Sequence, residues 1–552
     1  MKFKELADLC SRLDAMSGRL DMTDVVADFL KQTDEYLLPT ICRFLQGKVF
    51  PPWSEQELGI AEKLAVKCIS TVSGKTEREI EDRIRETGDL GLAAEQVLST
   101  KKQTTLYSRT LDVEDVEHSL IKLATLSGKG SQDKKIAYIN ELLSSAEGVE
   151  AKYIVRLILG ELRLGVGDGI VRDAIVKAFN APVEEVERAY YLTSDLGEVA
   201  RIAKASGERG LKEVAMKPGQ PIKVMLAQKK QSIREAVEDL GEAAYEIKYD
   251  GARVQIHKNK GEVTLFTRRL ENVTSQFPEI VAAATENLKA DAAIIEGEIV
   301  AIQMLGDRTP RPFQDLSRRI KRKYNIPEIQ KRIPAEINLF DVIYVNGESK
   351  LSTPYTERRK LLKAMVNETT TFRLAEQVVT KSKAKAEEFY NHALKMKHEG
   401  VMAKVLAAPY QPGSRVGFMY KVKPVMETLD LVVVGATWGE GRRANWLGSY
   451  LLAVYDPTTG EFQTIGRMAT GISDQQLEEY TEFFKPSIIK EEGKDLTIRP
   501  NVVFEVAYEE IQKSPTYTSG YALRFPRLVR LRDDKGPQDA DTPERIEEIL
   551  KK

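Results

Sequence analysis

The hydrophobic pattern divides the chain into an N-terminal helical part and a β-rich remainder. Up to about residue 212, apolar residues recur at three- and four-residue steps, as in segments 26–47 and 114–128. This spacing is typical of amphipathic helices. Gly and Pro interrupt these segments without dominating them, as expected of a folded domain rather than a tail. We therefore predict an all-α domain over residues 1–212.

From about residue 213 the pattern changes to short runs that are rich in β-branched and aromatic residues and bounded by Gly, Asn or Pro. Helical stretches separate some of these runs, which predicts an α+β domain over 213–427. Residues 428–552 hold five or so further strand-like runs and a final helix, which predicts a small all-β barrel. The strands expected in the α+β domain are 244–250, 252–258, 263–268, 292–302, 337–345, 400–405 and 419–424.

Composition supports a folded protein of several domains. The chain has 552 residues, of which 30% are charged and 42% hydrophobic, so two to four cores are expected. No apolar run reaches the length that spans a membrane, and the first residues lack a secretory signal, so we expect a cytoplasmic protein without membrane contact. The three scattered cysteines, Cys10, Cys42 and Cys68, argue against a disulfide framework or a zinc finger.

Two segments are candidates for binding phosphate groups. Residues 311–332 carry eight basic and two acidic side chains, in contrast to the overall net charge of -1. Such a run fits either a solvated helix face or a phosphate-binding surface. Residues 159–169 are dense in glycine and precede the helical segment 170–179. Bare backbone amides beside a helix N-terminus form an anion site, although an ordinary tight turn would give the same pattern.

The strongest chemical signal is the run Lys248-Tyr249-Asp250-Gly251-Ala252-Arg253. A lysine two residues before Asp-Gly, with an arginine five residues after the lysine, is the nucleophile signature of covalent nucleotidyltransferases. An amine attacks phosphorus only when it is neutral, and nearby cations with partial desolvation favour the neutral form. Lys421 and Lys423 alternate on a predicted strand and therefore face one side. There they could favour the neutral form of Lys248 and also hold the α-phosphate. A solvated strand face is the alternative for this pair.

Further motifs follow the lysine motif, around Arg268, Glu298, Phe340, Glu399 and Arg527. The chain resembles an ATP-dependent DNA ligase of the archaeal and eukaryotic replicative type, because the lysine motif and these further motifs occur in the same order as in that family. The resemblance covers nearly the whole chain. It implies a helical DNA-binding domain, a central adenylation domain and a C-terminal OB-fold. It also implies that the enzyme seals nicks in duplex DNA during replication, repair and recombination, through a lysyl-AMP on catalytic Lys248 and a 5′-adenylated DNA.

The resemblance implies a role for each residue of the nucleotide site. Glu246 would contact the adenine amino group, and Phe340 would stack on the purine, although a lone Phe in a strand also fits a core position. Glu298 would contact ribose or metal, and Glu399 would be a second Mg²⁺ ligand. Arg527 and Lys535 would contact the β- and γ-phosphates of ATP during enzyme adenylation. The remaining ATP-contacting residues are Arg253, Arg268, Arg415, Lys421 and Lys423.

A hard cation suits this chemistry, because pyrophosphate must leave in line with the attacking lysine. The expected partner is nicked double-stranded DNA, bound by a monomer mainly through phosphate contacts. The loop Trp438–Arg443 resembles a contact to the DNA backbone. The segment Gln103–Tyr107 resembles a degenerate sliding-clamp peptide but also fits a plain loop.

Two other functions stay open at this point. An RNA ligase or an mRNA-capping guanylyltransferase would share the lysine motif and the barrel, although the large helical domain favours duplex DNA. A non-catalytic DNA- or clamp-binding scaffold with a dead ligase fold would not need the intact set of Lys248, Glu298, Glu399 and Lys421. Sequence alone does not fix ATP over NAD, ADP or GTP.

Overall fold

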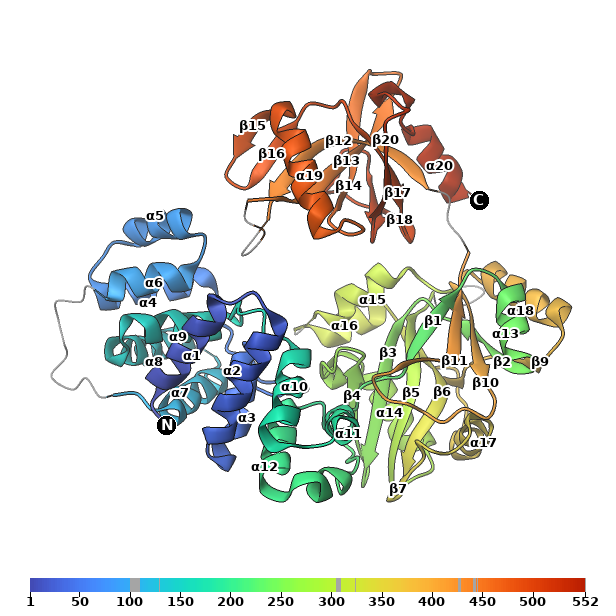
Figure 1. Cartoon of the computed structure of the whole chain (residues 1–552). Coiled ribbons are helices and arrows are strands. Elements are labelled where there is room, and N and C mark those ends of the chain that lie inside the picture. Colours follow the sequence, from blue (N-terminus) through green and yellow to red (C-terminus); the bar gives the residue numbers. More distant parts are fainter. Residues whose placement is uncertain are drawn as a thin grey trace. The chain divides into compact units, whose positions relative to one another are not determined.

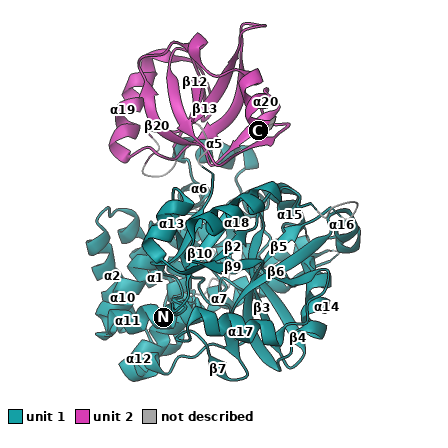
Figure 2. Ribbon diagram, turned by 90° about the vertical axis from the view of Figure 1, so that its right-hand side faces the viewer, with its two compact units in different colours: residues 1–424 teal, residues 425–552 magenta. Residues whose placement is uncertain are grey.

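The computed structural model describes residues 1–99, 110–128, 130–303, 309–322, 324–424, 428–439, 443 and 445–551. The chain forms two compact units, Met1–Pro424 and Val425–Lys552, coloured separately in Figure 2. The domain boundary that we predict near residue 212 falls inside the first unit, where the last helix of the N-terminal part ends at Lys212 and the first strand begins at Leu226.

The N-terminal part of the first unit is helical, and its helices begin and end at recognisable signals. Thr76 and Glu79 form a capping box at the start of α5, and Gly88 ends that helix in the left-handed conformation. The apolar faces pack into one core. The elements are α1 (Phe3–Asp14), α2 (Arg19–Gln32), η1 (Glu35–Leu37), α3 (Leu38–Leu45), α4 (Glu62–Ser73), α5 (Glu77–Thr87), α6 (Leu90–Leu98), α7 (Val113–Thr125), α8 (Ser131–Ser145), α9 (Gly148–Leu159), α10 (Asp168–Phe179), α11 (Val183–Thr193) and α12 (Leu196–Lys212).

The rest of the first unit contains two sheets with helices against them (Figure 1). One sheet has the order β1 (Leu226–Lys230), β11 (Arg415–Val422), β10 (Gly400–Val405), β2 (Ala243–Lys248) and β9 (Gln377–Thr380). The other has the order β4 (Glu262–Thr267), β3 (Ala252–Asn259), β5 (Ala292–Ala301), β6 (Ala335–Val345) and β7 (Glu348–Ser349), with β8 (Phe372–Leu374) beside β6. The helical elements are α13 (Ile233–Leu240), η2 (Thr274–Gln276), α14 (Pro278–Asn287), α15 (Phe313–Ile320), α16 (Ile326–Arg332), α17 (Tyr355–Met365) and α18 (Lys383–Lys395).

Separate apolar clusters hold these layers in place. Helices α14, α15 and α17 pack against the β3–β6 sheet, whereas α13 and α18 pack against the β2–β10 sheet. Val300 of β5 belongs to the cluster of the β2–β10 sheet, so the two sheets meet there. A further cluster joins Leu192 of α11 to Ile294 of β5 and Met419 of β11, and so ties the helical part to both sheets. The two sheets therefore hold the predicted nucleotide residues on a packed framework.

The second unit is β-rich, with one sheet that has the order β14-β13-β12-β16-β15 and continues from β12 through β17 to β20, and a hairpin of β18 and β19. It carries more strands among its described residues than the five or so that we expected, because β15, β16, β18 and β19 are only four or five residues long. The elements are β12 (Leu429–Trp438), β13 (Leu447–Asp456), β14 (Glu461–Met468), α19 (Asp474–Phe484), η4 (Lys485–Ser487), β15 (Ile488–Glu492), β16 (Asp495–Ile498), β17 (Val503–Ala507), β18 (Glu510–Lys513), β19 (Tyr521–Arg524), β20 (Arg527–Arg532), η5 (Pro537–Asp539) and α20 (Pro543–Lys551).

Candidate active site

Lys248 is the last residue of β2, and its ammonium lies against a carboxylate of the neighbouring strand region. Its Nζ is 2.6 Å from Oε2 of Glu399, and the Nζ of Lys423 is 2.5 Å from the same oxygen. The backbone reinforces this arrangement, because the Glu399 amide donates to the Lys248 carbonyl at 3.0 Å. Two predicted lysines and one predicted carboxylate, which are far apart in the sequence, therefore converge on one point.

The two carboxylates near Lys248 differ in their tendency to ionise. Burial alone would raise the pKa of Glu399, but the ammonium groups of Lys248 and Lys423 lower it to about 2. Burial raises the pKa of Glu298 to about 7, in spite of Lys248 and Arg253, and the charge of Glu399 adds to this rise. Glu298 lies opposite Arg253 in the pairing of β3 with β5, and a Cβ on Gly251 would lie 2.9 Å from its Cγ, so Glu298 lies beside the segment that carries Lys248. The structure thus brings both predicted metal ligands to the nucleophile.

Two glycines allow the backbone to approach closely around Lys248. A Cβ on Gly251 would lie 2.2 Å from the carbonyl oxygen of Ile299 in β5. Gly400 has a φ of +135°, and a Cβ there would lie 2.2 Å from the Val422 carbonyl oxygen. Any larger residue at either place would push the strands apart. Steric contact with a neighbouring strand therefore explains why glycine follows Asp250 and Glu399 in the sequence.

Glu246, two residues before Lys248, is buried at the centre of a polar cluster. Its Oε2 lies 2.5 Å from Nζ of Lys404, and its Oε1 accepts hydrogen bonds from the Tyr355 hydroxyl and, at 3.1 Å, from Nε2 of Gln377. A buried carboxylate with this many donors is held in one orientation. A defined acceptor of this kind suits recognition of an exocyclic amino group.

Phe340 is half-buried on β6 with cations over its ring. The guanidinium carbon of Arg253 lies 5.4 Å from the ring centroid, and the Nζ of Lys404 lies 4.6 Å from it. The pairing of β5 with β6 shifts at this point, from Glu296 opposite Asp341 to Gly297 opposite Leu339, which leaves Phe340 as the extra residue of a bulge. Bulges redirect side chains. Phe340 thus faces the site and is only partly a core residue.

Arg253 on β3 is fixed by a second buried carboxylate. Its NH2 donates to Oε2 of Glu296 at 2.7 Å, and its NH1 donates to the Met225 carbonyl at 2.9 Å. The hydroxyl of Tyr410 also donates to Oε2 of Glu296, at 3.0 Å. Glu296 is fully buried. The segment that leads from the helical part into β1 therefore ends in direct contact with a predicted site residue.

The other predicted cations of the first unit lie near Arg253. The Arg268 amide donates to the Arg253 carbonyl at 3.0 Å. Partial burial and the positive charges of Arg253 and Arg415 lower the pKa of Arg268. Lys421 lies opposite Met402 of β10, which lies opposite Glu246. Lys423 follows β11 by one residue rather than lying within it.

The two predicted residues of the second unit have different surroundings. Arg527 begins β20 and is exposed. The Nζ of Lys535 donates to Oδ2 of Asp430 at 2.7 Å, and NH1 of Arg532 donates to both oxygens of Asp430. Lys535 therefore has an acidic partner within its own unit.

The glycine-rich segment forms the predicted connection between two helices. α9 ends at Leu159, Gly160 adopts the left-handed conformation, and α10 begins at Asp168. Beneath the loop, buried Arg156 donates from Nε to Asp89 at 3.1 Å and from NH1 to the Leu162 carbonyl at 3.2 Å. Arg156 therefore links this loop to Asp89, at the start of α6. The basic run 311–332 forms α15 and α16.

Our sequence reasoning assigned no role to five residues of the site. One of them, Glu296, holds Arg253 and lies two residues before Glu298 in the same predicted strand. Lys404 ends the motif that begins at Glu399, so its place in that motif was an available signal. Tyr355, Gln377 and Tyr410 had no sequence signal, because a single polar residue near a strand or helix end is common. Two predictions concern residues outside the described part of the chain, namely the clamp-like segment Gln103–Tyr107 and the centre of the loop Trp438–Arg443. Within the described residues, no helix combines the length and the apolar character needed to cross a membrane.

Known DNA ligases match this chain over its whole length. Residues 2–176 match the family model "DNA ligase N terminus", residues 224–423 match "ATP dependent DNA ligase domain", and residues 443–535 match "ATP dependent DNA ligase C terminal region". The DNA ligase of Thermococcus onnurineus is 51% identical over 550 residues, covering 100% of this chain and 98% of that protein. The DNA ligase of Archaeoglobus fulgidus is 47% identical over 552 residues, covering 100% and 99%. The solved structure "Pmar-Lig_Pre." shares the fold at a TM-score of 0.59 and 19% identity, covering 96% of this chain and 99% of that one.

Proposed function

The chain belongs to the ATP-dependent DNA ligases, which seal nicks in DNA, and on that premise we propose how its residues divide the work. Lys248 is the nucleophile. Its ammonium first gives up a proton, and the neutral amine then forms a bond from Nζ to the α-phosphorus of ATP. The bond from that phosphorus to the bridging oxygen breaks, pyrophosphate leaves, and the nitrogen gives up a second proton as it becomes the phosphoramidate. The AMP then passes to the 5′-phosphate of a nick, and the 3′-hydroxyl displaces it.

The convergence of Lys248 and Lys423 on Glu399 carries this proposal. It places the amine that must react beside a second cation able to hold a phosphate oxygen. Glu246 on β2, with the groups around it, and the face of Phe340 on β6 would form the purine site. Glu246 lies on the same strand as Lys248. We propose that Arg253, Arg268, Arg415 and Lys421 contact the ribose and phosphates, as the motifs imply.

Mg²⁺ fits the residues that are present. Glu298 and Glu399 lie near each other and offer the hard oxygen ligands that this ion prefers. Among the described residues, no group of three or more acidic, His or Cys side chains could hold a metal without help. We therefore propose that Glu298 and Glu399 would hold the ion together with phosphate oxygens of ATP, and that an ion held there would supply positive charge for the departing pyrophosphate.

For the remaining parts, the proposal follows the domain order. The second unit is proposed to be an OB-fold that presents Arg527 and Lys535 to the β- and γ-phosphates. The loop 159–169 and the helices α15 and α16 are proposed DNA contacts, because backbone amides and clustered cations bind phosphates. We further propose that the enzyme acts as a cytoplasmic monomer, with Gln103–Tyr107 as a segment to test for binding to a sliding clamp.

The test is mass analysis of the intact protein and its peptides. The protein is first treated with pyrophosphate to remove any bound AMP, and is then incubated with Mg²⁺ and ATP, NAD or GTP in separate reactions. We expect an AMP adduct on Lys248 from ATP alone, followed by closure of nicked duplex DNA. An adduct from GTP would favour capping chemistry, and the absence of any adduct would favour a non-catalytic scaffold.

A further inference from the structure

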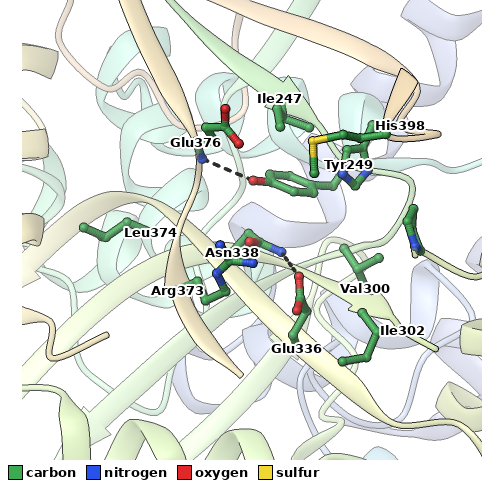
Figure 3. Close-up of a pocket in the computed structure, with 12 residues that line it drawn as sticks. Ile247, Tyr249, Val300, Ile302, Glu336, Asn338, Arg373, Leu374, Glu376 and His398 are labelled. Carbon is green, nitrogen blue, oxygen red and sulfur yellow. Dashed lines mark hydrogen bonds between the residues drawn. The ribbon is translucent and has the colours of Figure 1, made fainter. Parts of the chain in front are cut away.

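A cavity of about 70 Å³ lies in the first unit behind the strand that carries Lys248 (Figure 3). Ile247, Val300 and Ile302 form an apolar wall, and Glu336 and Asn338 of β6 form a polar one. None of these residues belongs to the nucleotide site described above.

The cavity lies on the opposite side of the chain from the reacting groups. Ile247 and Tyr249, which flank Lys248, both line it. Successive side chains of an extended chain point to opposite faces, so Lys248 points away from the cavity. The second segment repeats this pattern, because His398 lines the cavity whereas the next residue, Glu399, pairs with Lys248. Each segment thus presents one residue to the reaction and its neighbour to the cavity.

The two neighbours contact each other. The rings of Tyr249 and His398 meet edge to face, with centroids 4.9 Å apart and planes at 70°. The Tyr249 hydroxyl accepts a hydrogen bond from the Glu376 amide at 3.2 Å, drawn as a dashed line in Figure 3. On the reacting side, the same segments are joined by the ion pair of Lys248 with Glu399 and by their backbone hydrogen bond. The contact of Tyr249 with His398 therefore joins the same two segments on the cavity side, opposite the ion pair. The spacing of these segments sets the distance between Lys248 and Glu399.

We propose that Tyr249 and His398 are a positioning pair for the adenylation step. Their ring contact holds the β2 end and the segment before β10 at the spacing that places the Lys248 amine for in-line attack, an inference that rests on the proposed function. Rates of reactions between held groups are sensitive to displacements of about 1 Å. Loss of the contact should therefore slow attack by Lys248 and leave ATP binding at Glu246 and Phe340 intact.

The test uses the full-length chain with His398→Ala. Single-turnover formation of the enzyme–AMP adduct is measured against ATP concentration. We expect the maximum rate to fall by about 10- to 100-fold, with the half-saturating ATP concentration unchanged. Closure of a nick that already carries a 5′-AMP does not use the lysine as a nucleophile, so its rate should stay within about threefold of the wild type.

Two further variants separate positioning from general loosening. His398→Phe keeps a ring and should retain the adenylation rate within about threefold. Met396→Ala opens the same cavity without removing either ring, so it should behave like the wild type. If His398→Ala does not fold, His398→Asn removes the ring with a smaller loss of volume and answers the same question.

The inference fails if His398→Ala forms the adduct at the wild-type rate, or if Met396→Ala is slowed as much as His398→Ala. It also fails if adenylation and closure of the adenylated nick fall together. In each case, a wild-type adduct that disappears in Lys248→Ala would leave the proposed function standing. If the wild type itself forms no adduct, the proposed function fails first.

Discussion

The two units hold their functional cations in different ways. In the first unit, the side chains of Glu246 and Lys404 are 3% and 7% exposed, and Glu296 beside Arg253 is fully buried. In the second unit, Lys535 is 32% exposed beside Asp430. Asp430 itself is 14% exposed, so this pair is only partly open to solvent. Separating a buried pair leaves a desolvated charge and is costly, whereas a partly exposed pair exchanges partners at lower cost. The pair of Glu246 with Lys404 should therefore be harder to separate than the pair of Asp430 with Lys535.

The largest effect should come from removing the nucleophile. We expect Lys248→Ala to lower the rate of enzyme–AMP formation by at least about 1,000-fold, because no other group replaces the attacking amine. Mass analysis after incubation with ATP measures this directly. Lys395→Ala, an exposed lysine on α18, is the matched control and should adenylate normally. An adduct on Lys248→Ala would remove this residue from its proposed role.

Breaking a buried pair should destabilise the first unit. Lys404→Met leaves the Glu246 carboxylate without its buried cation, and we expect a loss of about 3 kcal/mol in the free energy of unfolding. Urea denaturation followed by fluorescence checks this. Lys360→Met removes an exposed cation that pairs with Glu357, and the change there should stay below about 1 kcal/mol. Equal effects of the two variants would contradict the contrast between buried and exposed pairs.

Acid should weaken the first unit before the second. Burial lowers the pKa of His257 to about 3, and its Nδ1 accepts a hydrogen bond from the Gly219 amide at 3.1 Å. Because the unfolded chain takes up a proton near pH 6.5 and the folded chain does not, this contribution is present above that pH and is lost as the pH falls. The loss should reach about 2 kcal/mol at pH 5.

The measurement is hydrogen exchange of peptides from both units at pH 7 and pH 5, corrected for the intrinsic dependence of exchange on pH. All four histidines of the chain lie before residue 425, so the second unit lacks this source of acid sensitivity. His257→Gln should reduce the pH dependence of the first unit and leave that of the second unchanged. The same pH dependence in His257→Gln and the wild type would contradict the assignment.

The smallest effect should come from the partly exposed pair of Asp430 with Lys535. Asp430→Asn weakens the hold on Lys535, so the half-saturating ATP concentration for adenylation should fall by roughly threefold, as expected for a pair that solvent reaches. The maximum rate should not change. Asp474→Asn, which alters an exposed partner of Arg443, is the control. A tenfold or larger loss of rate in Asp430→Asn would show that Asp430 positions Lys535 rather than competing for it.

Much of the fold follows from local sequence pattern. The runs 429–438 and 447–456 are rich in β-branched, aliphatic and aromatic residues, and they form β12 and β13 with these bounds. The pattern was less informative in segment 26–47, which the structure divides into α2, η1 and α3 around Asp34 and Pro39. The apolar spacing continues across that break, so periodicity alone did not locate it. The strands β15 and β16 were missed for two reasons. β15 is mostly exposed and lacks apolar alternation, whereas β16 alternates exposed and buried residues but is only four residues long, too short for the alternation to stand out.

The reaction class of this protein could be read from its amino-acid order alone. A lysine before Asp-Gly, carboxylates in the strands that follow and a basic C-terminal strand each act through their own functional groups, so their order in the chain was enough to indicate nucleotidyl transfer. Which groups contact one another depends on the three-dimensional fold. The pairing of Lys248 with Glu399, the donors around Glu246 and the contact of Tyr249 with His398 join residues that are far apart in the chain, because sheet register and packing, rather than sequence order, set the distances between side chains.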